Sequence, residues 1–129
     1  MTSVKDGSLT ASVVGMKNKN KASVTIPATV TIGDSIYKVT AIGESAFRSN
    51  KKIKKVTIGA HINTIGKNSF YGCSKLKTIT VKTKLLNKVN ANAFKGINKK
   101  AVIKVPSDKK KSYKKLFKNK GQAKSVTIK

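Results

Sequence analysis

The sequence predicts a β-solenoid, a stack of short turns in which strands from successive turns pair in parallel. Alternating stretches of the form Val-Thr-Ile recur, the last four at offsets of 23, 24 and 23 residues. A fixed period between about 20 and 50 residues marks stacked units that cover one another's apolar faces. The alternation places β-branched side chains on one face and a polar one on the other, as in half-buried strands. The five stretches are 24–26, 56–58, 79–81, 103–105 and 126–128.

A phenylalanine recurs with nearly the same period and predicts the core. Phe47, Phe70 and Phe94 are separated by 23 and 24 residues, and each follows a small residue, Ala or Ser. Identical positions in successive turns form a column in a solenoid. We therefore expect three stacked phenylalanines to fill the interior, with the small residues leaving room for them.

Glycines mark the turn after a second short strand in each unit. Gly43 and Gly66 each follow an isoleucine at equivalent positions, and Asn90 occupies that position in the third unit. Glycine adopts positive φ without steric cost, and asparagine tolerates it. We expect the chain to turn sharply here with positive φ.

Residues 62–81, INTIGKNSFYGCSKLKTITV, carry the densest form of this pattern. They resemble the repeat of the BspA-like leucine-rich repeat family, aliphatic-x-x-Ile-Gly-x-x-Ala/Ser-Phe-x-x-Cys-x-x-Leu-x-x-Ile-x-Ile. Asn50 and Ile97 depart from it at the cysteine position, and Lys100 departs from it at the leucine position. The resemblance covers about residues 24–129. It implies a right-handed leucine-rich repeat solenoid with short parallel strands, few helical turns and three repeats over 39–105.

We expect residues 1–38 to form an N-terminal β-hairpin cap leading into the first strand. Segment 9–14 should pair with 22–26 through the polar link 15–21, and a second hairpin should join 30–32 to 35–39 through Gly33 and Asp34. Such turn residues between alternating segments are typical of hairpins. A solenoid needs caps because its terminal units would otherwise expose apolar faces.

Residues 106–129 predict a C-terminal cap made of a helix and a strand, within the same single domain. Pro106 ends a strand, and Ser107 or Asp108 should cap a helix reaching about Lys120, with Gly121 as its stop. The helix should bury Tyr113, Leu116 and Phe117, the apolar residues on one side.

The chain is strongly basic. It has 29 Lys and Arg residues, all lysines but Arg48, against 4 acidic residues, for a formal charge of +25. Such a surface attracts polyanions and lowers stability at low salt by self-repulsion. No apolar segment is long enough for a membrane span, and the first residues lack a secretory signal. The chain is therefore either cytosolic or an excised part of an exported protein, whose signal would lie upstream.

Catalysis is not favoured. Cys73 and His61 are the sole thiol and imidazole, but the resemblance places Cys73 inside, beside Phe70 and Leu76, and His61 at a solvated corner. A catalytic thiolate needs a polar, activating environment. The four carboxylates are scattered, and no phosphate loop occurs. We expect no enzyme activity, no cofactor and no metal site.

Two surfaces are candidates for binding. The outward side chains of the sheet should lie in register and contact a ligand, whereas lysines on the outer face of the C-terminal helix should bind polyanions. Both sets could equally be solvated surface. The ligand-binding candidates are Lys55, Thr57, Thr78, Thr80 and Lys104, and the polyanion-binding candidates are Lys111, Lys114, Lys115 and Lys118.

Three functions remain open. The leading hypothesis, drawn from the resemblance, is a monomeric adhesion module at the bacterial cell surface or outside the cell. Its partner would be a host extracellular protein, an anionic glycan or a wall polyanion. The alternative is a structural spacer or wall-retention segment. A nonspecific nucleic-acid binder is the weakest hypothesis, because one arginine and three tyrosines offer little base recognition.

Overall fold

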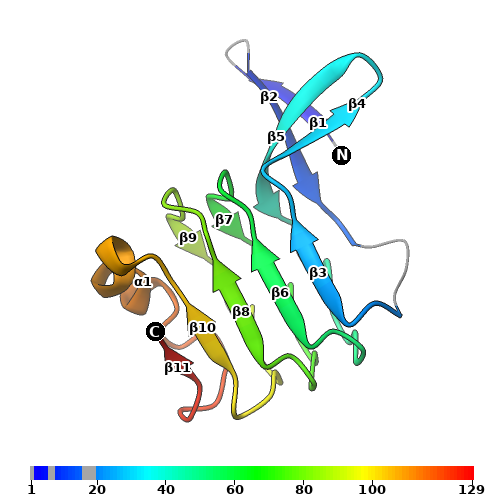
Figure 1. Cartoon of the computed structure of the whole chain (residues 1–129). Coiled ribbons are helices and arrows are strands. Elements are labelled where there is room, and N and C mark those ends of the chain that lie inside the picture. The colour runs from blue at the N-terminus through cyan, green and yellow to red at the C-terminus, as the bar shows by residue number, and fades with distance from the viewer. Residues whose placement is uncertain (1, 6–7, 16–19) are drawn as a thin grey trace.

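A computed structural model describes residues 2–5, 8–15 and 20–129. The chain forms a solenoid walled by two sheets, with one short helix at its C-terminal end (Figure 1). The predicted fold class is confirmed, since parallel strands from successive turns pair in both sheets.

The principal sheet contains all five alternating stretches, in the order β11-β10-β8-β6-β3. Every pairing in it is parallel. Inward side chains of the central strands are buried, with Val56, Ile79 and Ile103 each fully shielded, whereas Val24 and Ile128 in the end strands are partly buried. The strands are β3 (Ser23–Ile26), β6 (Lys55–Ile58), β8 (Thr78–Val81), β10 (Val102–Lys104) and β11 (Thr127–Ile128).

The last strand is shifted relative to the spacing predicted from the sequence. Ile103 pairs with Ile128, 25 residues later, and not with Val126. Side chains alternate with a period of two, so a shift of two residues leaves the same residues facing inward. The hydrophobic pattern therefore could not reveal the true register.

The second sheet runs β1-β2-β5-β7-β9, and β4 also pairs with β5. The longest strand, β5, carries β2 and β7 in parallel at its C-terminal half. Pairing of β5, β7 and β9 gives each turn its second short strand. The bounds are β1 (Thr2–Lys5), β2 (Ser8–Val13), β4 (Thr29–Ile32), β5 (Ser35–Ile42), β7 (Thr64–Ile65) and β9 (Lys88–Val89).

The first predicted hairpin, 9–14 with 22–26, is wrong. Strand β2 pairs with β1 and β5, whereas β3 pairs in parallel with β6 in the other sheet. The two segments lie on opposite walls because each stacks on an equivalent strand of the next turn. Part of the predicted link between them, 16–19, lies outside the described residues.

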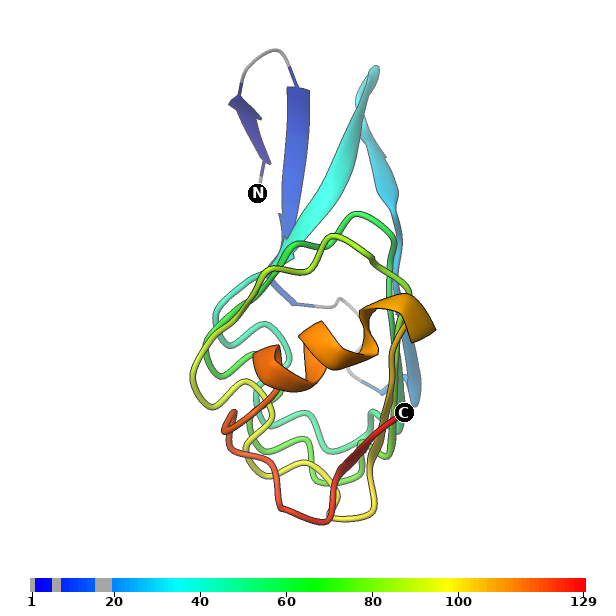
Figure 2. The ribbon, with the colours of Figure 1, turned by 90° about the vertical axis from the view of Figure 1, so that its left-hand side faces the viewer.

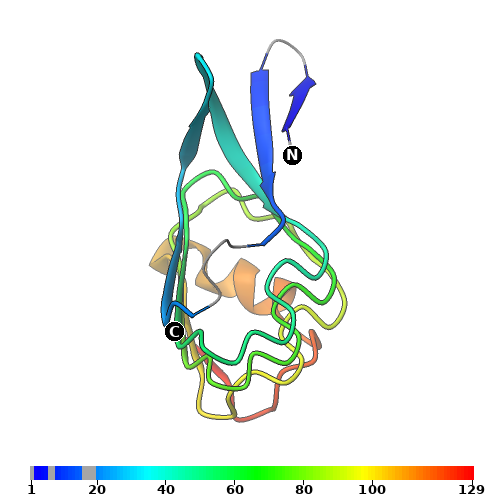
Figure 3. The ribbon, with the colours of Figure 1, turned by 90° about the vertical axis from the view of Figure 1, so that its right-hand side faces the viewer.

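The second predicted hairpin is confirmed. Strands β4 and β5 pair antiparallel from Thr29 with Lys38 to Ile32 with Ser35, around Gly33 at a φ of 61°. Together with the β1–β2 hairpin it projects beyond the turns of the solenoid (Figures 1 and 3). This insertion explains why Val24 and Val56 pair although 32 residues separate them.

The phenylalanine column is confirmed. The rings of Phe47 and Phe70 stack with centroids 5.2 Å apart, and those of Phe70 and Phe94 with centroids 5.6 Å apart. Phe117 extends the column from the C-terminal cap, with its ring centroid 5.4 Å from that of Phe94. Stacked aromatic rings therefore run through the interior.

Gly43 and Gly66 turn out to serve close backbone packing, and the predicted positive φ is wrong for both. A Cβ on Gly66 would lie 2.6 Å from the carbonyl oxygen of Ile42 in the preceding turn. Positive φ occurs instead two residues later, at Ser45, Asn68 and Asn92, each at 57°. Asn90 also has no positive φ; its side-chain amide donates to the carbonyl of Ile65 at 3.0 Å.

The C-terminal helix is shorter than predicted. A 3₁₀ turn, η1 (Ser107–Lys109), leads into α1 (Lys110–Leu116), and neither Ser107 nor Asp108 caps it through its side chain. Asp108 pairs with Lys84 at 3.3 Å instead. Asn119 takes a φ of 59°, and Gln122 donates to the carbonyl of Phe117 at 2.6 Å. The chain thus reverses early, because it must return to pair β11 with β10.

Candidate binding surfaces

The outward residues of the principal sheet form rows across neighbouring strands. Lys55 lies opposite Thr78, while Thr57 lies opposite Thr80, which in turn lies opposite Lys104. The two lysines are exposed and the threonines are half-buried. The structure therefore brings together the five ligand-binding candidates on one face, and their role in binding stays a prediction.

The rows extend further than the sequence indicated. Ser23 and Thr25 of β3 lie opposite Lys55 and Thr57, and Thr127 of β11 lies opposite Val102. The alternation in β3 was visible in the sequence, but the inserted hairpin hid its register. The face consequently spans five strands.

The four polyanion-binding candidates lie at a different place. Figure 2 shows α1 lying across the C-terminal end of the stack. Lys111, Lys114 and Lys115 belong to α1 and are exposed, as is Lys118 just beyond its end. The helix lysines form a cationic surface on the cap, separate from the outward rows of the sheet.

Tyr113 fastens this helix to the solenoid. Its hydroxyl donates to the carbonyl of Thr83 at 2.8 Å and accepts from the backbone N–H of Leu86 at 3.2 Å. Burial raises the pKa of Tyr113, the bond from Leu86 opposes the rise, and nearby Asp108 adds to it. The predicted burial of Tyr113 and Phe117 is confirmed, whereas Leu116 is only partly buried.

Cys73 and His61 occupy positions unsuited to nucleophilic catalysis. Cys73 is fully buried, its thiol donates to the carbonyl of Phe47 at 3.0 Å, and burial raises its pKa to about 11 despite the opposing bond at Asn50 and charge of Lys51. A protonated, shielded thiol is unreactive. His61 is half-buried, with Nδ1 2.8 Å from the carbonyl oxygen of Ala28, so the expected solvated corner is partly wrong.

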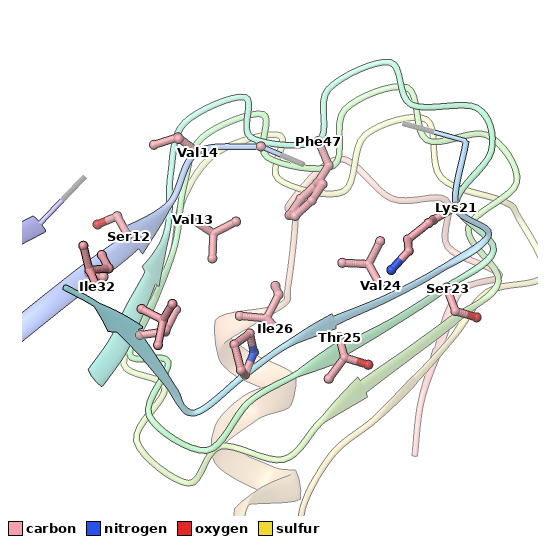
Figure 4. A pocket seen from close by; sticks show the side chains of 15 residues that line it. Ser12, Val13, Val14, Lys21, Ser23, Val24, Thr25, Ile26, Ile32 and Phe47 are labelled. Atoms are coloured by element: carbon pink, nitrogen blue, oxygen red, sulfur yellow. The ribbon is translucent and has the colours of Figure 1, made fainter. Parts of the chain in front are cut away.

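An apolar hollow of about 690 Å³ opens at the N-terminal end of the stack. Val13, Val24, Ile26 and Phe47 point into it (Figure 4). Val14 and Ile32 also line it and are exposed. The first ring of the phenylalanine column thus lies beside this hollow, whereas the C-terminal end is covered by α1.

Within the part of the chain that the structure describes, no helix is long and apolar enough to cross a membrane. No group of three or more metal-ligating side chains gathers in residues 2–5, 8–15 and 20–129. Among the described residues, exposed lysines greatly outnumber the exposed acids Asp34, Glu44 and Asp108.

The model of the BspA type leucine rich repeat region matches residues 16–129 with six copies. The chain belongs to this family. The match covers the principal sheet, the phenylalanine column and the C-terminal cap, so the family repeat explains most of the architecture. A search of curated proteins found no match.

Three solved structures resemble the fold. A leucine-rich repeat protein from Bacteroides capillosus is 22% identical with a TM-score of 0.73, covering 99% of this chain and 92% of that one. A leucine rich cell surface protein from Faecalibacterium prausnitzii is 25% identical with a TM-score of 0.62, covering 83% and 37%. A leucine-rich repeat protein from Bacteroides ovatus is 23% identical with a TM-score of 0.56, covering 84% and 36%. The matched part thus spans little more than a third of the latter two.

Proposed function

We propose that the chain is a noncatalytic binding module of a bacterial cell-surface protein, serving adhesion. The observation that carries the proposal is the outward face of the principal sheet, where Lys55, Thr57, Thr80 and Lys104 stand in register on rigid strands. Repeat proteins present such extended faces to partners. The Faecalibacterium neighbour, itself a cell surface protein, supports the location.

The partner has anionic chemistry. Ammonium groups and small hydroxyls suit a sulfated or carboxylated glycan, an acidic face of a host protein or a wall polyanion. The helix lysines, Lys111, Lys114, Lys115 and Lys118, add long-range attraction from the cap. Only one salt bridge, from Lys84 to Asp108, occurs among the described residues, so most ammonium groups there have no carboxylate partner in the chain.

Retention on immobilised heparin, with elution by increasing salt, tests this function. The wild type should be retained at low salt, and Lys55→Gln with Lys104→Gln should elute earlier. A matched control removes the same charge at the other wall, with Lys88→Gln in β9 and Lys67→Gln in the turn after β7, both exposed. Equal elution of the two double variants would remove the sheet face from the proposal, and no retention of the wild type at low salt would remove its polyanion part.

The alternative, a spacer that retains another domain on the wall, is favoured by the lysines of the cap. Under that function, retention on the wall should depend on the helix lysines alone. Their replacement by glutamine should abolish binding to isolated teichoic acid while leaving binding through the sheet face unchanged. Loss of both activities together would contradict the spacer.

A further inference from the structure

The turns that lead into four strands of the principal sheet lie side by side along one edge of the solenoid. These turns precede β6, β8, β10 and β11, at the lower ends of the strands in Figure 1. Hydrogen bonds hold them together: Lys77 donates its N–H to the carbonyl of Lys54 at 3.0 Å, and Val102 donates to the carbonyl of Lys77 at 2.8 Å. Successive turns along this edge are thus held in register, as the strands of the sheet are.

The same turns carry lysines at equivalent positions. The Asn98 side chain donates to the carbonyl of Ser74 at 3.5 Å, which sets Lys99 beside Lys75. The hydroxyl of Ser125 donates to the carbonyl of Lys99 at 2.6 Å, which holds the turn before β11 against the turn before β10. The strand register makes Lys124 equivalent to Lys99, since each lies three residues before one of the paired residues Thr127 and Val102. We call the resulting surface the lysine ridge. It consists of the column Lys52, Lys75, Lys99 and Lys124 together with the neighbouring pair Lys54 and Lys77.

Among the described residues, no carboxylate compensates the ridge. All six ridge lysines are exposed. Asp34 lies in the β4–β5 turn, Glu44 follows β5, and Asp108 pairs with Lys84, so none of these acids belongs to the four turns. Like charges on neighbouring strands are destabilising, and the backbone positions of the four column lysines repeat at about the 4.8 Å spacing of the strands. The ridge is therefore a line of positive charge that no carboxylate in residues 2–5, 8–15 and 20–129 neutralises.

We propose that the lysine ridge binds one extended anionic polysaccharide, laid across the turns parallel to the solenoid axis. The proposal rests on the polyanion part of the proposed function and extends its binding surface from the sheet face to the ridge along the edge of that sheet. An extended polysaccharide with an anionic group on each sugar presents charges in a line, as the ridge does, and the four column lysines span roughly 14 Å. Duplex nucleic acid instead winds its phosphates around a helix, and its recognition favours arginine.

Affinity for heparin oligosaccharides of increasing length tests the ridge. The ridge variant carries Lys52→Gln, Lys75→Gln, Lys99→Gln and Lys124→Gln; its control carries the same replacement at the helix lysines, Lys111, Lys114, Lys115 and Lys118. Both lose four charges from exposed positions. Wild-type affinity should rise with length until the chain spans the column and then level off. The ridge variant should bind about tenfold more weakly, with a shallower salt dependence, while the control loses less.

Equal losses in the two variants would show that only net charge matters and would overturn the ridge, leaving polyanion binding by the proposed function intact. Wild-type affinity in the ridge variant would overturn it as well. Absence of any heparin binding in the wild type would instead end the polyanion part of the function. Lysine-to-arginine replacement at the four column positions keeps the charge and should retain binding. If the quadruple glutamine variant fails to fold, the double variant Lys75→Gln with Lys99→Gln replaces it in the same measurement. Equal affinity for single-stranded DNA of matched charge would overturn the choice of polysaccharide.

Discussion

The phenylalanine column and the lysine ridge are built by the same register and have opposite energetics. Phe47, Phe70 and Phe94 stack at 5.2 and 5.6 Å inside the solenoid, where aromatic contacts add to burial. Lys52, Lys75 and Lys99 occupy equivalent positions in successive turns on the outside, where like charges repel. In a solenoid, each contact within a column recurs between successive turns. An apolar interior column therefore stabilises the fold, whereas a charged exterior column lowers its stability. The lysine ridge is therefore better explained by binding of a ligand than by a contribution to folding.

The largest expected effect comes from breaking the interior column at its centre. Phe70→Ala removes the ring that contacts both Phe47 and Phe94, and it should lower the free energy of unfolding by about 3–5 kcal/mol. Urea denaturation measures the change. Leu85→Ala, at a side chain that is 56% exposed, is the control and should have almost no effect. Similar losses in the two variants would contradict the column as the centre of the core.

Ionisation of the buried Cys73 thiol tests the contrast between the apolar interior and the charged exterior. The folded pKa of Cys73, about 11, lies above its ordinary value of 9.0, so the unfolded chain loses the proton first as pH rises. Stability from this thiol is complete below pH 9 and is lost between pH 9 and 11, by up to about 2–3 kcal/mol.

Urea denaturation from pH 8 to 10.5 measures this loss. The comparison is with Cys73→Ala, which keeps every other ionisable group and whose stability should fall less steeply over this range. Parallel pH profiles for the two proteins would show that the thiol is not shielded as described.

The phenylalanine column also permits a smaller test. The hydroxyl of Ser69 is buried beside Phe70 without a hydrogen-bond partner among the described residues, at a position where other turns have Ala46 and Ala93. Ser69→Ala should raise the free energy of unfolding by about 1 kcal/mol, because an unsatisfied buried polar group is removed. Ser74→Ala, at an exposed position, should leave it unchanged. Destabilisation by Ser69→Ala would imply a bound partner for the hydroxyl.

The sequence was sufficient to predict the interior. Phe47, Phe70 and Phe94 recur at a constant spacing because stacked turns require it, and Val56 and Ile79 alternate with threonine because one face is buried. The parallel pairing of the principal sheet followed from these periods.

What the sequence could not predict depends on pairing between distant segments. Leu9 and Ala22 begin stretches that resemble two halves of a hairpin, yet they lie in different sheets, since each segment pairs with a neighbouring turn. Ile128, and not Val126, pairs with Ile103, and the alternation of apolar and polar residues is the same in either register. The alternation therefore could not predict this pairing. For the ridge, lysines at 52, 75, 99 and 124 resemble ordinary solvated residues until hydrogen bonds between turns set them in one line.

The salt dependence of stability tests the cost of the exterior column most directly. The ridge variant, lacking Lys52, Lys75, Lys99 and Lys124, should be more stable than the wild type at low salt by about 1 kcal/mol, since three neighbouring like-charge pairs are relieved. The difference should disappear in high salt or with saturating heparin, which screen or neutralise the column. The helix variant, lacking Lys111, Lys114, Lys115 and Lys118, should gain less at the same net charge. Equal stability of the ridge and helix variants at every salt concentration would contradict the claim that the register builds a strained line of charge.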